Sequence, residues 1–393
     1  MTSIVFLVPR ATTSWDRDRW GFRILAAKGI DAGAIDLSVV LGTRAQTGAS
    51  NAVDFRPKDL EELSRFVQSA ASSTVFIDYV RGISGPDLRS APVFKALRDA
   101  LAVYYVVAAG SLPSPPSARG RLLRAATRPA RAARHLAGLI GRAVAERFGG
   151  YIPPFKVFGP PAPAVTAFSA RYRIPADRLI PTHSLDYDGL FRSEGGAPAI
   201  APSCVFIDDG LAGHPDFDAP GRASAKPTEY FETLRRVFDR VEAATGYPVI
   251  IAAHPRSEAL RPEFVGGREV IRGRTADAVA ASVLVIGHAS TALGFAALGR
   301  KPIILLGGRH VADAGLTSAV NGMSTALGVP VIDPDDAEAL AALSPDLSLI
   351  PTEQYAKYVA QHVRPSDAPV ASLWEVIAEH AVEDVRQRRG GDK

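Results

Sequence analysis

Cysteine is almost missing from this chain of 393 residues, which holds a single one, Cys204. One cysteine excludes an intrachain disulfide framework and a zinc site built from cysteine thiolates. Such sparse use of cysteine is typical of a reducing compartment, so we expect a cytoplasmic protein. The apolar run near the N-terminus has no basic leader ahead of it, which predicts that it is not a secretory signal.

Long apolar runs are also missing, since none approaches the ~18 residues that a membrane-spanning helix needs. We therefore expect a soluble protein, or one attached to a surface. The carboxylate and histidine spacings typical of metal ligands are absent, so no obligatory metal is expected. No G-x-G-x-x-G follows the first predicted strand, which excludes the standard dinucleotide fingerprint. The content of 47% hydrophobic and 22% charged residues is that of a globular protein.

Short apolar runs rich in Val and Ile alternate with helical patterns along the chain. Such runs predict buried parallel strands in doubly wound α/β sheets. Loss of this periodicity near residues 193–201 predicts two domains, 1–195 and 196–393, that face each other across a cleft. The predicted strands are residues 4–8, 34–40, 74–80, 102–109, 156–159 and 179–182 in the first half, and 204–207, 249–253, 283–287 and 329–332 in the second.

Polar residues follow the predicted strands of the second half, where ligands of open α/β sheets bind. Pro255 ends one strand and turns the chain outward, so His254 is expected to project from the sheet. Ser290 and Thr291 precede a predicted helix at 292–298, whose free N–H groups and dipole favour an anion; a simple N-cap is the alternative. The predicted phosphate-binding residues are His254, Arg256, Ser257, Arg274, Thr275, His288, Ser290 and Thr291.

Acid and base candidates lie at the same strand ends. His254 is a candidate general acid for a departing nucleotide, and a buried structural histidine is the alternative. Asp208 and Asp209 end the neighbouring strand, and either carboxylate is a candidate base for an acceptor hydroxyl. Because Asp-Gly is a common turn pair, a turn-capping role is the alternative for both.

A weaker set of polar residues follows other predicted strands and is assigned to an acceptor. For His214 and Asp216 the alternative is the capping of a turn. The candidate acceptor-binding residues are Asp16, Arg17, Arg19, His183, Asp186, Asp188, His214 and Asp216.

A strongly basic helical pattern covers residues 119–147. It has eight arginines, one acidic residue, Glu146, and interspersed leucines; the arginines are Arg119, Arg121, Arg124, Arg128, Arg131, Arg134, Arg142 and Arg147. One interpretation is a solvated helix, and another is an interfacial segment on an anionic membrane surface. Nucleic acid ranks third and is not expected as a partner, because no aromatic residues interleave to stack on bases.

Four stretches resemble bacterial surface-carbohydrate transferases of capsule and lipopolysaccharide biosynthesis. They read IPTHSLDYD, FIDDGLAGHPDF, PVIIAAHPRS and VIRGRTADAVAASVLVIGHASTALGFAALGRKPI, and together they cover roughly residues 179–306. More distantly, His254-Pro255 with Ser290-Thr291 is similar to the His-Pro and Ser/Thr motifs of bacterial sialyltransferases and Kdo transferases. The resemblance implies a GT-B fold, with an N-terminal acceptor domain and a C-terminal nucleotide-sugar donor domain.

The same resemblance implies a metal-independent, inverting glycosyltransferase with a CMP-linked donor, either Kdo or a nonulosonate such as sialic acid. In it the histidine and the Ser/Thr pair contact the CMP phosphate, and an acidic motif resembling Asp208-Asp209-Gly210 provides the base. That motif lies in the N-terminal domain of many such enzymes, so Asp16, Asp18 and Asp78 are competing bases here.

The implied acceptor is a surface glycan, free or lipid-linked, and the implied location is cytoplasmic, with the inner membrane face as a possible surface. Three alternatives remain open at this stage: a polyol-phosphate transferase, a nucleotide-sugar epimerase of the same architecture, and a non-catalytic glycan-binding protein.

Overall fold

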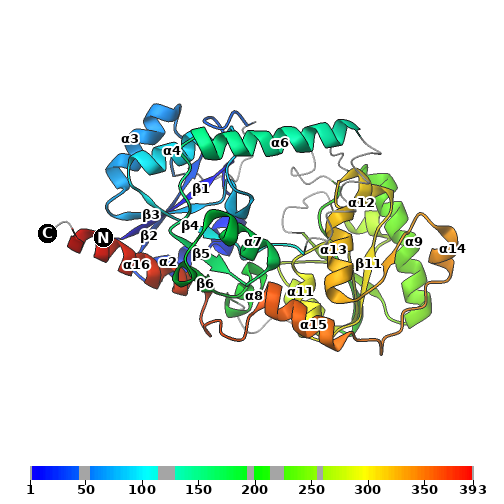
Figure 1. The fold of residues 1–393 in the computed structure, drawn as a ribbon. Coiled ribbons are helices and arrows are strands. Elements are labelled where there is room, and N and C mark those ends of the chain that lie inside the picture. Colours follow the sequence, from blue (N-terminus) through cyan, green and yellow to red (C-terminus); the bar gives the residue numbers. More distant parts are fainter. Residues whose placement is uncertain are drawn as a thin grey trace. The chain divides into compact units, whose positions relative to one another are not determined.

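The computed structural model describes residues 2–43, 54–113, 129–192, 199–212, 225–254 and 260–391. The chain forms two compact units (Figure 1). Unit 1 comprises residues 1–109, 117–191 and 365–393, and unit 2 comprises residues 110–116 and 192–364. The chain enters unit 2 close to the predicted boundary. The assignment of all of 196–393 to one domain is corrected, because the C-terminal segment belongs to unit 1.

Unit 1 is built on a six-stranded sheet in which neighbouring strands pair in parallel, with the order β2-β1-β3-β4-β5-β6. This confirms the predicted doubly wound α/β class. The strands are β1 (Ser3–Val8), β2 (Asp31–Asp36), β3 (Thr74–Asp78), β4 (Val103–Val107), β5 (Lys156–Gly159) and β6 (Leu179–Pro181).

The helices of unit 1 follow the predicted alternation with strands, and two short helices lie on either side of Gly21. They are α1 (Ser14–Arg19), α2 (Phe22–Ala27), α3 (Leu60–Ala70), α4 (Ala91–Asp99), α6 (Pro129–Phe148), α7 (Pro163–Tyr172), α8 (Leu185–Asp188) and α16 (Leu373–Gly391), with 3-10 turns at Gly82–Ser84, Ala176–Arg178 and Gly189–Arg192.

Alternate side chains of β1 enter two separate cores, because successive residues of a strand point to opposite faces. Ile4 and Phe6 pack with α2 and α16, whereas Val5 and Leu7 pack with α3, α4 and α7. Both faces of the sheet are therefore covered, as the continuous apolar strands require.

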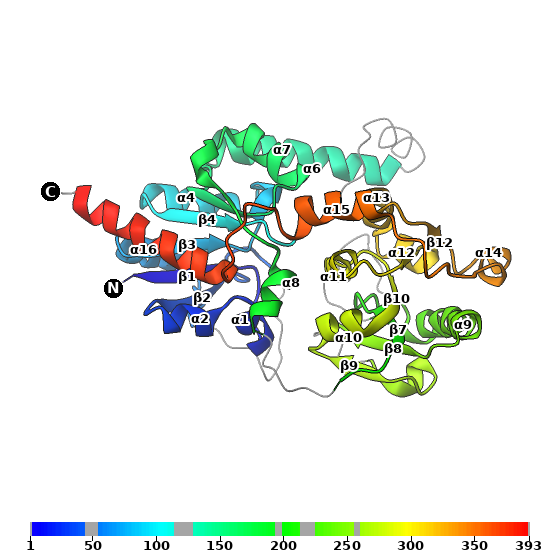
Figure 2. The ribbon, with the colours of Figure 1, turned by 90° about the horizontal axis from the view of Figure 1, so that it is seen from below.

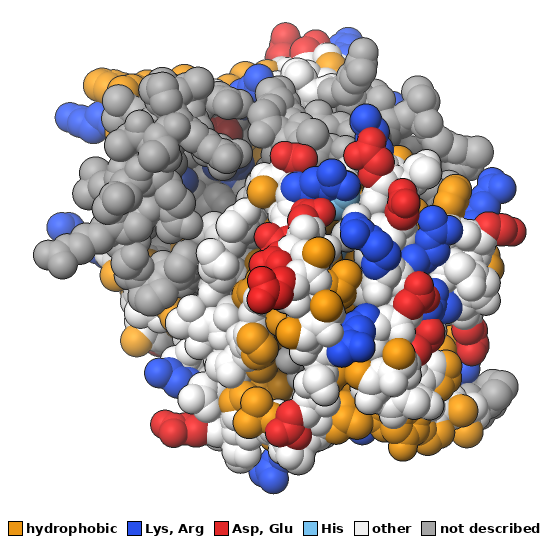
Figure 3. Space-filling view, turned by 90° about the vertical axis from the view of Figure 1, so that its right-hand side faces the viewer, with side chains coloured by type: hydrophobic (Ala, Val, Ile, Leu, Met, Phe, Trp, Pro, Cys, Tyr) orange, Lys and Arg blue, Asp and Glu red, His pale blue; other side chains and the backbone are white. Residues whose placement is uncertain are grey.

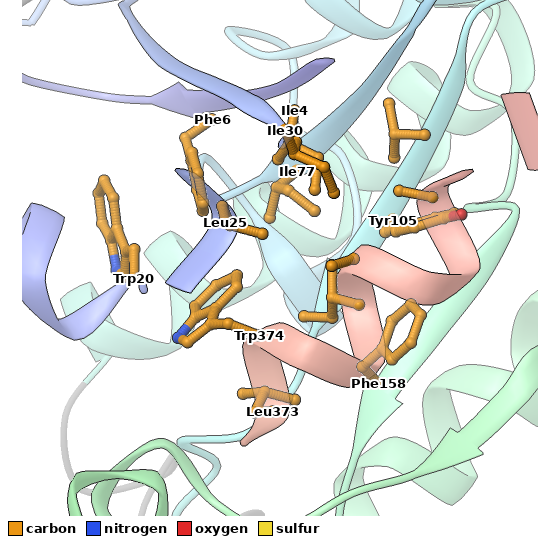
Figure 4. Close-up of a cluster of buried hydrophobic side chains, with 14 of the residues drawn as sticks. Ile4, Phe6, Trp20, Leu25, Ile30, Ile77, Tyr105, Phe158, Leu373 and Trp374 are labelled. Carbon is orange, nitrogen blue, oxygen red and sulfur yellow. The ribbon is translucent and has the colours of Figure 1, made fainter. Parts of the chain in front are cut away.

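The C-terminal helix α16 closes one face of the unit 1 sheet (Figure 2). Trp374 and Leu373 point into the cluster around Phe6, Trp20 and Leu25 (Figure 4). The Trp374 ring lies so close to Gly21 that a Cβ there would come within 2.3 Å of it, and Gly21 has φ +63°. Glycine is needed at this position for both reasons.

Polar contacts fix the far end of α16 to the same sheet. Lys156 Nζ lies 2.6 Å from Asp384 Oδ1 and is largely buried with it. The Tyr105 hydroxyl donates to the other oxygen of Asp384. A buried pair of charges needs such further hydrogen bonds to offset its desolvation.

Unit 2 has a second six-stranded sheet, with the order β12-β11-β10-β7-β8-β9, in which neighbouring strands also pair in parallel. Its strands are β7 (Ser203–Ile207), β8 (Val249–Ala253), β9 (Val270–Arg272), β10 (Ser282–Gly287), β11 (Ile303–Leu306) and β12 (Val331–Ile332). The predicted strands of this half are confirmed within two residues at each end.

The helices of unit 2 complete the α/β alternation. They are α9 (Pro227–Thr245), α10 (Thr275–Ala281), α11 (Leu293–Leu298), α12 (Arg309–Asp313), α13 (Thr317–Leu327), α14 (Ala337–Ala341) and α15 (Thr352–Tyr358), with a 3-10 turn at Pro262–Val265 and a π-helical turn at Val359–Val363. Among the described residues, no helix is long and apolar enough to cross a membrane. The cleft expected between the domains stays a prediction.

Candidate functional site

The strand order of unit 2 reverses direction at β7. Its first strand, β7, pairs with β8 on one side and with β10 on the other. The connections from β7 and β10 therefore leave in opposite directions, and ligands of open α/β sheets bind at such a switch point, outside the carboxyl ends. Asp208 and Asp209 follow β7, His254 follows β8, and His288 to Thr291 follow β10. The structure thus brings these predicted residues to one sheet edge.

Asp208 is buried, with 4% of its surface exposed, and both carboxylate oxygens accept backbone N–H groups. Oδ1 accepts from Gly210 at 2.9 Å, and Oδ2 accepts from His254 at 3.2 Å. The second bond joins the end of β7 to the end of β8. We infer that Asp208 positions the backbone of His254, because neither of its oxygens faces solvent as a base would require.

Asp209 is half-buried and occupies the switch point itself. Its Oδ2 accepts the backbone N–H of Ala289 at 2.9 Å, which joins β7 to the segment after β10. Burial raises the pKa of Asp209, against the opposing effects of His288, the Ala289 N–H and the Ser290 side chain. A half-buried carboxylate with a raised pKa suits proton transfer better than its fully buried neighbour does.

His288 has a structural role rather than the predicted contact with phosphate. It is 1% exposed, and Nδ1 lies 2.9 Å from the Leu306 carbonyl, to which it donates. Nε2 is then free to accept from the Tyr230 hydroxyl at 3.0 Å. Both ring nitrogens have hydrogen-bond partners inside the protein, so His288 joins β10 to β11 and α9. The prediction that His288 binds phosphate is therefore corrected to a structural role.

His254, Ser290 and Thr291 are the partly exposed predicted residues at this edge. The predicted helix after Ser290 is confirmed within one residue, since α11 runs from Leu293 to Leu298 and has six residues. Ser290 and Thr291 accept the backbone N–H groups of Leu293 and Gly294 through their carbonyls, in a turn ahead of the helix. A helix this short has a weak dipole, so the hydroxyl groups rather than the helix end are the candidate anion contacts.

Arg274 and Thr275 lie at the start of α10, after β9. The Arg274 guanidinium pairs with Asp277 on the same helix, with Nε and Oδ2 3.0 Å apart. Four predicted residues, Arg256, Ser257, His214 and Asp216, lie outside the described residues. Among the described residues, no group of three or more His, Cys, Asp or Glu side chains could hold a metal ion.

The candidate acceptor residues of unit 1 lie near the carboxyl ends of β1 and β6, but several have structural partners. The Asp16 carboxylate belongs to a capping box with Thr13. Arg17 pairs with Asp54, and Arg19 with Asp186. Asp16 is therefore corrected from a competing base to a capping residue, because its carboxylate belongs to the capping box of α1.

His183 and Asp188 are buried and hold the start of α16. The His183 Nε2 lies 2.8 Å from the Ala371 carbonyl, and Asp188 Oδ1 accepts from the Leu373 N–H at 2.7 Å and from the Ser372 hydroxyl. The prediction that His183 and Asp188 bind the acceptor is therefore corrected, because both residues dock the C-terminal helix. The sequence could not reveal this because their partners are more than 180 residues away.

Asp78 and Asp18, the other competing bases, are also engaged. Asp78 accepts the backbone N–H groups of Val80, Arg81 and Gly82, and burial raises its pKa against these bonds. Asp18 pairs with Arg23 at the surface. Both carboxylates are held by these contacts, so Asp78 and Asp18 are less suitable bases than Asp209.

Two residues that the sequence analysis missed lie behind the switch point. Tyr230, on α9, is fully enclosed beside His288, and His310, on α12, packs edge-on against the Tyr230 ring with centroids 5.6 Å apart. Nε2 of His310 is buried and has no hydrogen-bond partner within the described residues. The sequence signal, a Tyr in an amphipathic helix, is no different from that of an ordinary core residue.

Asn substitutions at the two neighbouring aspartates are expected to have different effects. In Asp208→Asn one oxygen becomes an NH2 group that faces a backbone N–H, so the free energy of unfolding should fall by about 1–3 kcal/mol. In Asp209→Asn one oxygen still accepts from Ala289, so stability should fall less. Urea unfolding of both variants measures the difference, and equal losses would contradict the assigned positioning role of Asp208.

The free energy of unfolding is expected to fall on mild acidification because of three histidines. Burial lowers the pKa of His310, His362 and His380 below the ordinary value of 6.5. The stability that these neutral histidines contribute is present above the pKa that they have in the unfolded chain. It is lost as the pH falls through their pKa in the folded protein, since the unfolded chain binds the protons first. Urea unfolding between pH 7.5 and 5 should show this fall. His310→Phe should reduce the fall, and the exposed change Tyr247→Phe serves as the control.

No protein-family model matches this chain, and a comparison with curated proteins finds no match. Solved structures match over nearly the whole chain, and they have GT-B folds, so the chain has a GT-B-like fold. The wall teichoic acid polymerase TagF matches with TM-score 0.54 and 10% identity, over 98% of this chain and 90% of TagF.

Two further structures match at similar levels. S. aureus MnaA in complex with UDP matches with TM-score 0.50 and 12% identity, over 98% of this chain and 97% of MnaA. A Listeria monocytogenes protein assigned as a UDP-N-acetylglucosamine 2-epimerase matches with TM-score 0.51 and 11% identity, over 97% and 95% of the two chains. At such low identity these likenesses show the fold alone.

Proposed function

We propose that this chain is a metal-independent, inverting glycosyltransferase that takes its sugar from a nucleotide-linked donor bound by unit 2. The observation that carries the proposal is the edge at the β7/β10 switch point. It combines a half-buried carboxylate of raised pKa, Asp209, with three partly exposed polar residues, His254, Ser290 and Thr291. The two hydroxyls and the imidazole suit a phosphate, and the carboxylate suits proton transfer.

The proposed reaction is a displacement at the anomeric carbon of the donor. An acceptor hydroxyl forms the new C–O bond while the bond from carbon to the phosphate oxygen breaks, and Asp209 takes the hydroxyl proton. His254, Ser290 and Thr291 stabilise the charge on the departing phosphate. In this scheme unit 1 is the acceptor domain, and the acceptor is a surface glycan or its lipid-linked form made in the cytoplasm.

The nucleotide is the finer part of the proposal. The motif resemblance favours CMP linked to Kdo or a nonulosonic acid, and the UDP in the MnaA complex makes UDP-sugars the competing donors. Calorimetric titration of the full chain with CMP, UDP and GDP distinguishes them, with one nucleotide expected to bind. Binding of none would refute a nucleotide-sugar enzyme, and binding of UDP alone would refute the CMP assignment.

A nucleotide-sugar 2-epimerase is the second candidate, because the Listeria and MnaA likenesses cover the chain. An epimerase would exchange a carbon-bound hydrogen with solvent in the absence of an acceptor. Incubation with UDP-N-acetylglucosamine in D2O, followed by NMR at carbon 2, tests this: deuterium there favours the epimerase, and its absence favours the transferase.

The TagF likeness keeps a polyol-phosphate transferase as a further alternative. Phosphorus analysis of the product separates the two transferases, since a sugar transfer adds no phosphorus to the acceptor. A chain that binds glycan and turns over no donor would instead be the non-catalytic alternative.

A further inference from the structure

Helix α6 exposes an apolar face to solvent. Ile140, Val144 and Phe148 are spaced by four residues and so share one face of the helix. Ile140 is 56% and Phe148 79% exposed, and Leu139 and Val144 are also exposed. A surface helix usually carries polar residues on its solvent-facing side, so this exposed apolar face requires an explanation.

The side of α6 next to this face is the one that packs on unit 1. Gly141 and Ala145 are buried, and a Cβ at Gly141 would lie 3.5 Å from Leu88. Leu88 is itself 58% exposed and extends the apolar surface beyond the helix. The orientation of α6 is therefore fixed by its small residues, and the bulky ones point away from the core.

The charge of the same segment is of one sign. Residues 119–147 contain eight arginines, and Glu146 is their single acidic residue. The Glu146 carboxylate is taken by Arg171, with Oε2 2.7 Å from Nη2, and by the Tyr172 hydroxyl. These hydrogen-bond partners of Glu146 come from α7 rather than from its own helix.

The face in Figure 3 carries charges of both signs, with Lys and Arg near Asp and Glu and apolar side chains among them. An exposed apolar face on a segment whose sequence holds eight arginines and one acidic residue is the pattern of a helix that lies in a membrane interface, where apolar side chains enter the acyl boundary and arginines meet anionic head groups.

We propose that α6, together with Leu88, docks the protein on an anionic bilayer, with Ile140, Val144 and Phe148 inserted. The surface is separate from the switch-point site of unit 2 and does not depend on the proposed function. It would bring the chain to a membrane surface on which lipid-linked molecules lie.

Flotation of the full chain with vesicles tests the proposal. Wild-type protein should float with phosphatidylcholine vesicles that contain 30% phosphatidylglycerol, float less in high salt, and stay unbound with phosphatidylcholine alone. The double variant Ile140→Ser/Phe148→Ser should bind about tenfold less or weaker still. Arg147→Gln should bind about fivefold less, from a loss of roughly 1 kcal/mol per basic residue.

Matched controls keep the test decisive. Leu349→Ser/Val370→Ser removes two other exposed apolar side chains and should float like wild type. Nucleotide titration of all variants should give unchanged affinities, so failure of the donor site and failure of the membrane site are separable.

Three results would overturn the proposal. The first is equal flotation with neutral and anionic vesicles, or flotation with neither. The second is unchanged flotation of Ile140→Ser/Phe148→Ser. The third is a dimer, measured by light scattering, that this double variant converts to monomer without any vesicle binding by the wild type, because the apolar face would then contact a second copy.

Discussion

Replacing Trp374 with alanine is expected to lower the free energy of unfolding by about 3–5 kcal/mol, the range for a fully buried aromatic residue. The side chain is buried in the core of unit 1, where it packs against Gly21 and lies 5.5 Å from the Phe6 ring centre. Its Nε1 donates to the Arg19 carbonyl at 2.9 Å, so the substitution also leaves a carbonyl without its donor.

The matched control is Val382→Ala, on the same helix but 44% exposed. It should cost much less, because little apolar surface returns to water. Urea unfolding followed by circular dichroism measures both variants. Equal losses for Trp374→Ala and Val382→Ala would contradict the docking of α16 on unit 1, and so would a chain without residues 365–393 that unfolds like wild type.

Replacing His254 with alanine is expected to weaken nucleotide binding by about tenfold to a hundredfold. This is the effect of losing a hydrogen bond to a charged phosphate, about 1.5–3 kcal/mol. Fold stability should change little, because His254 is partly exposed and the Asp208 carboxylate contacts its backbone, which the substitution retains. Calorimetric titration with the nucleotide that binds wild type measures the loss.

Two variants frame this result. His380→Ala, in unit 1, removes a histidine far along the chain from the site and should bind nucleotide like wild type. Asp209→Asn should also bind it, yet lose turnover by about 10²–10⁴-fold if the carboxylate is the base. Unchanged binding and turnover in His254→Ala would show the donor-site assignment to be wrong.

The strands could be predicted because burial on both faces demands unbroken apolar runs. The VIIAA of β8 and the KVFG of β5 match the predicted strands residue for residue. The least successful prediction, β2, reads DAGAID, and its Gly and Ala give a weak apolar signal. The helix after β10 was predicted to begin at Ala292, and α11 begins one residue later, at Leu293, after a turn through Ser290 and Thr291.

The roles of the polar site residues were harder to predict than their places. Asp208, Asp209 and His288 each end a strand, as expected. Asp208 is held by two backbone N–H groups, whereas Asp209 is held by one and keeps an exposed edge. The strands that lie beside each residue in the sheet decide this difference. Strand order decides those neighbours, and β10 lies beside β7 although β8 and β9 come between them in the chain.

The sequence by itself determined the α/β class, the alternation of elements and the positions of polar residues at strand ends, because hydrophobic periodicity and turn chemistry are local. Tertiary structure decided which strand ends share an edge, which carboxylates are engaged, and that α16 returns to unit 1. The physical reason is that these depend on contacts between residues far apart in the chain, such as Asp188 with Leu373 and Asp209 with Ala289. Spacing along the sequence carries no record of such pairs.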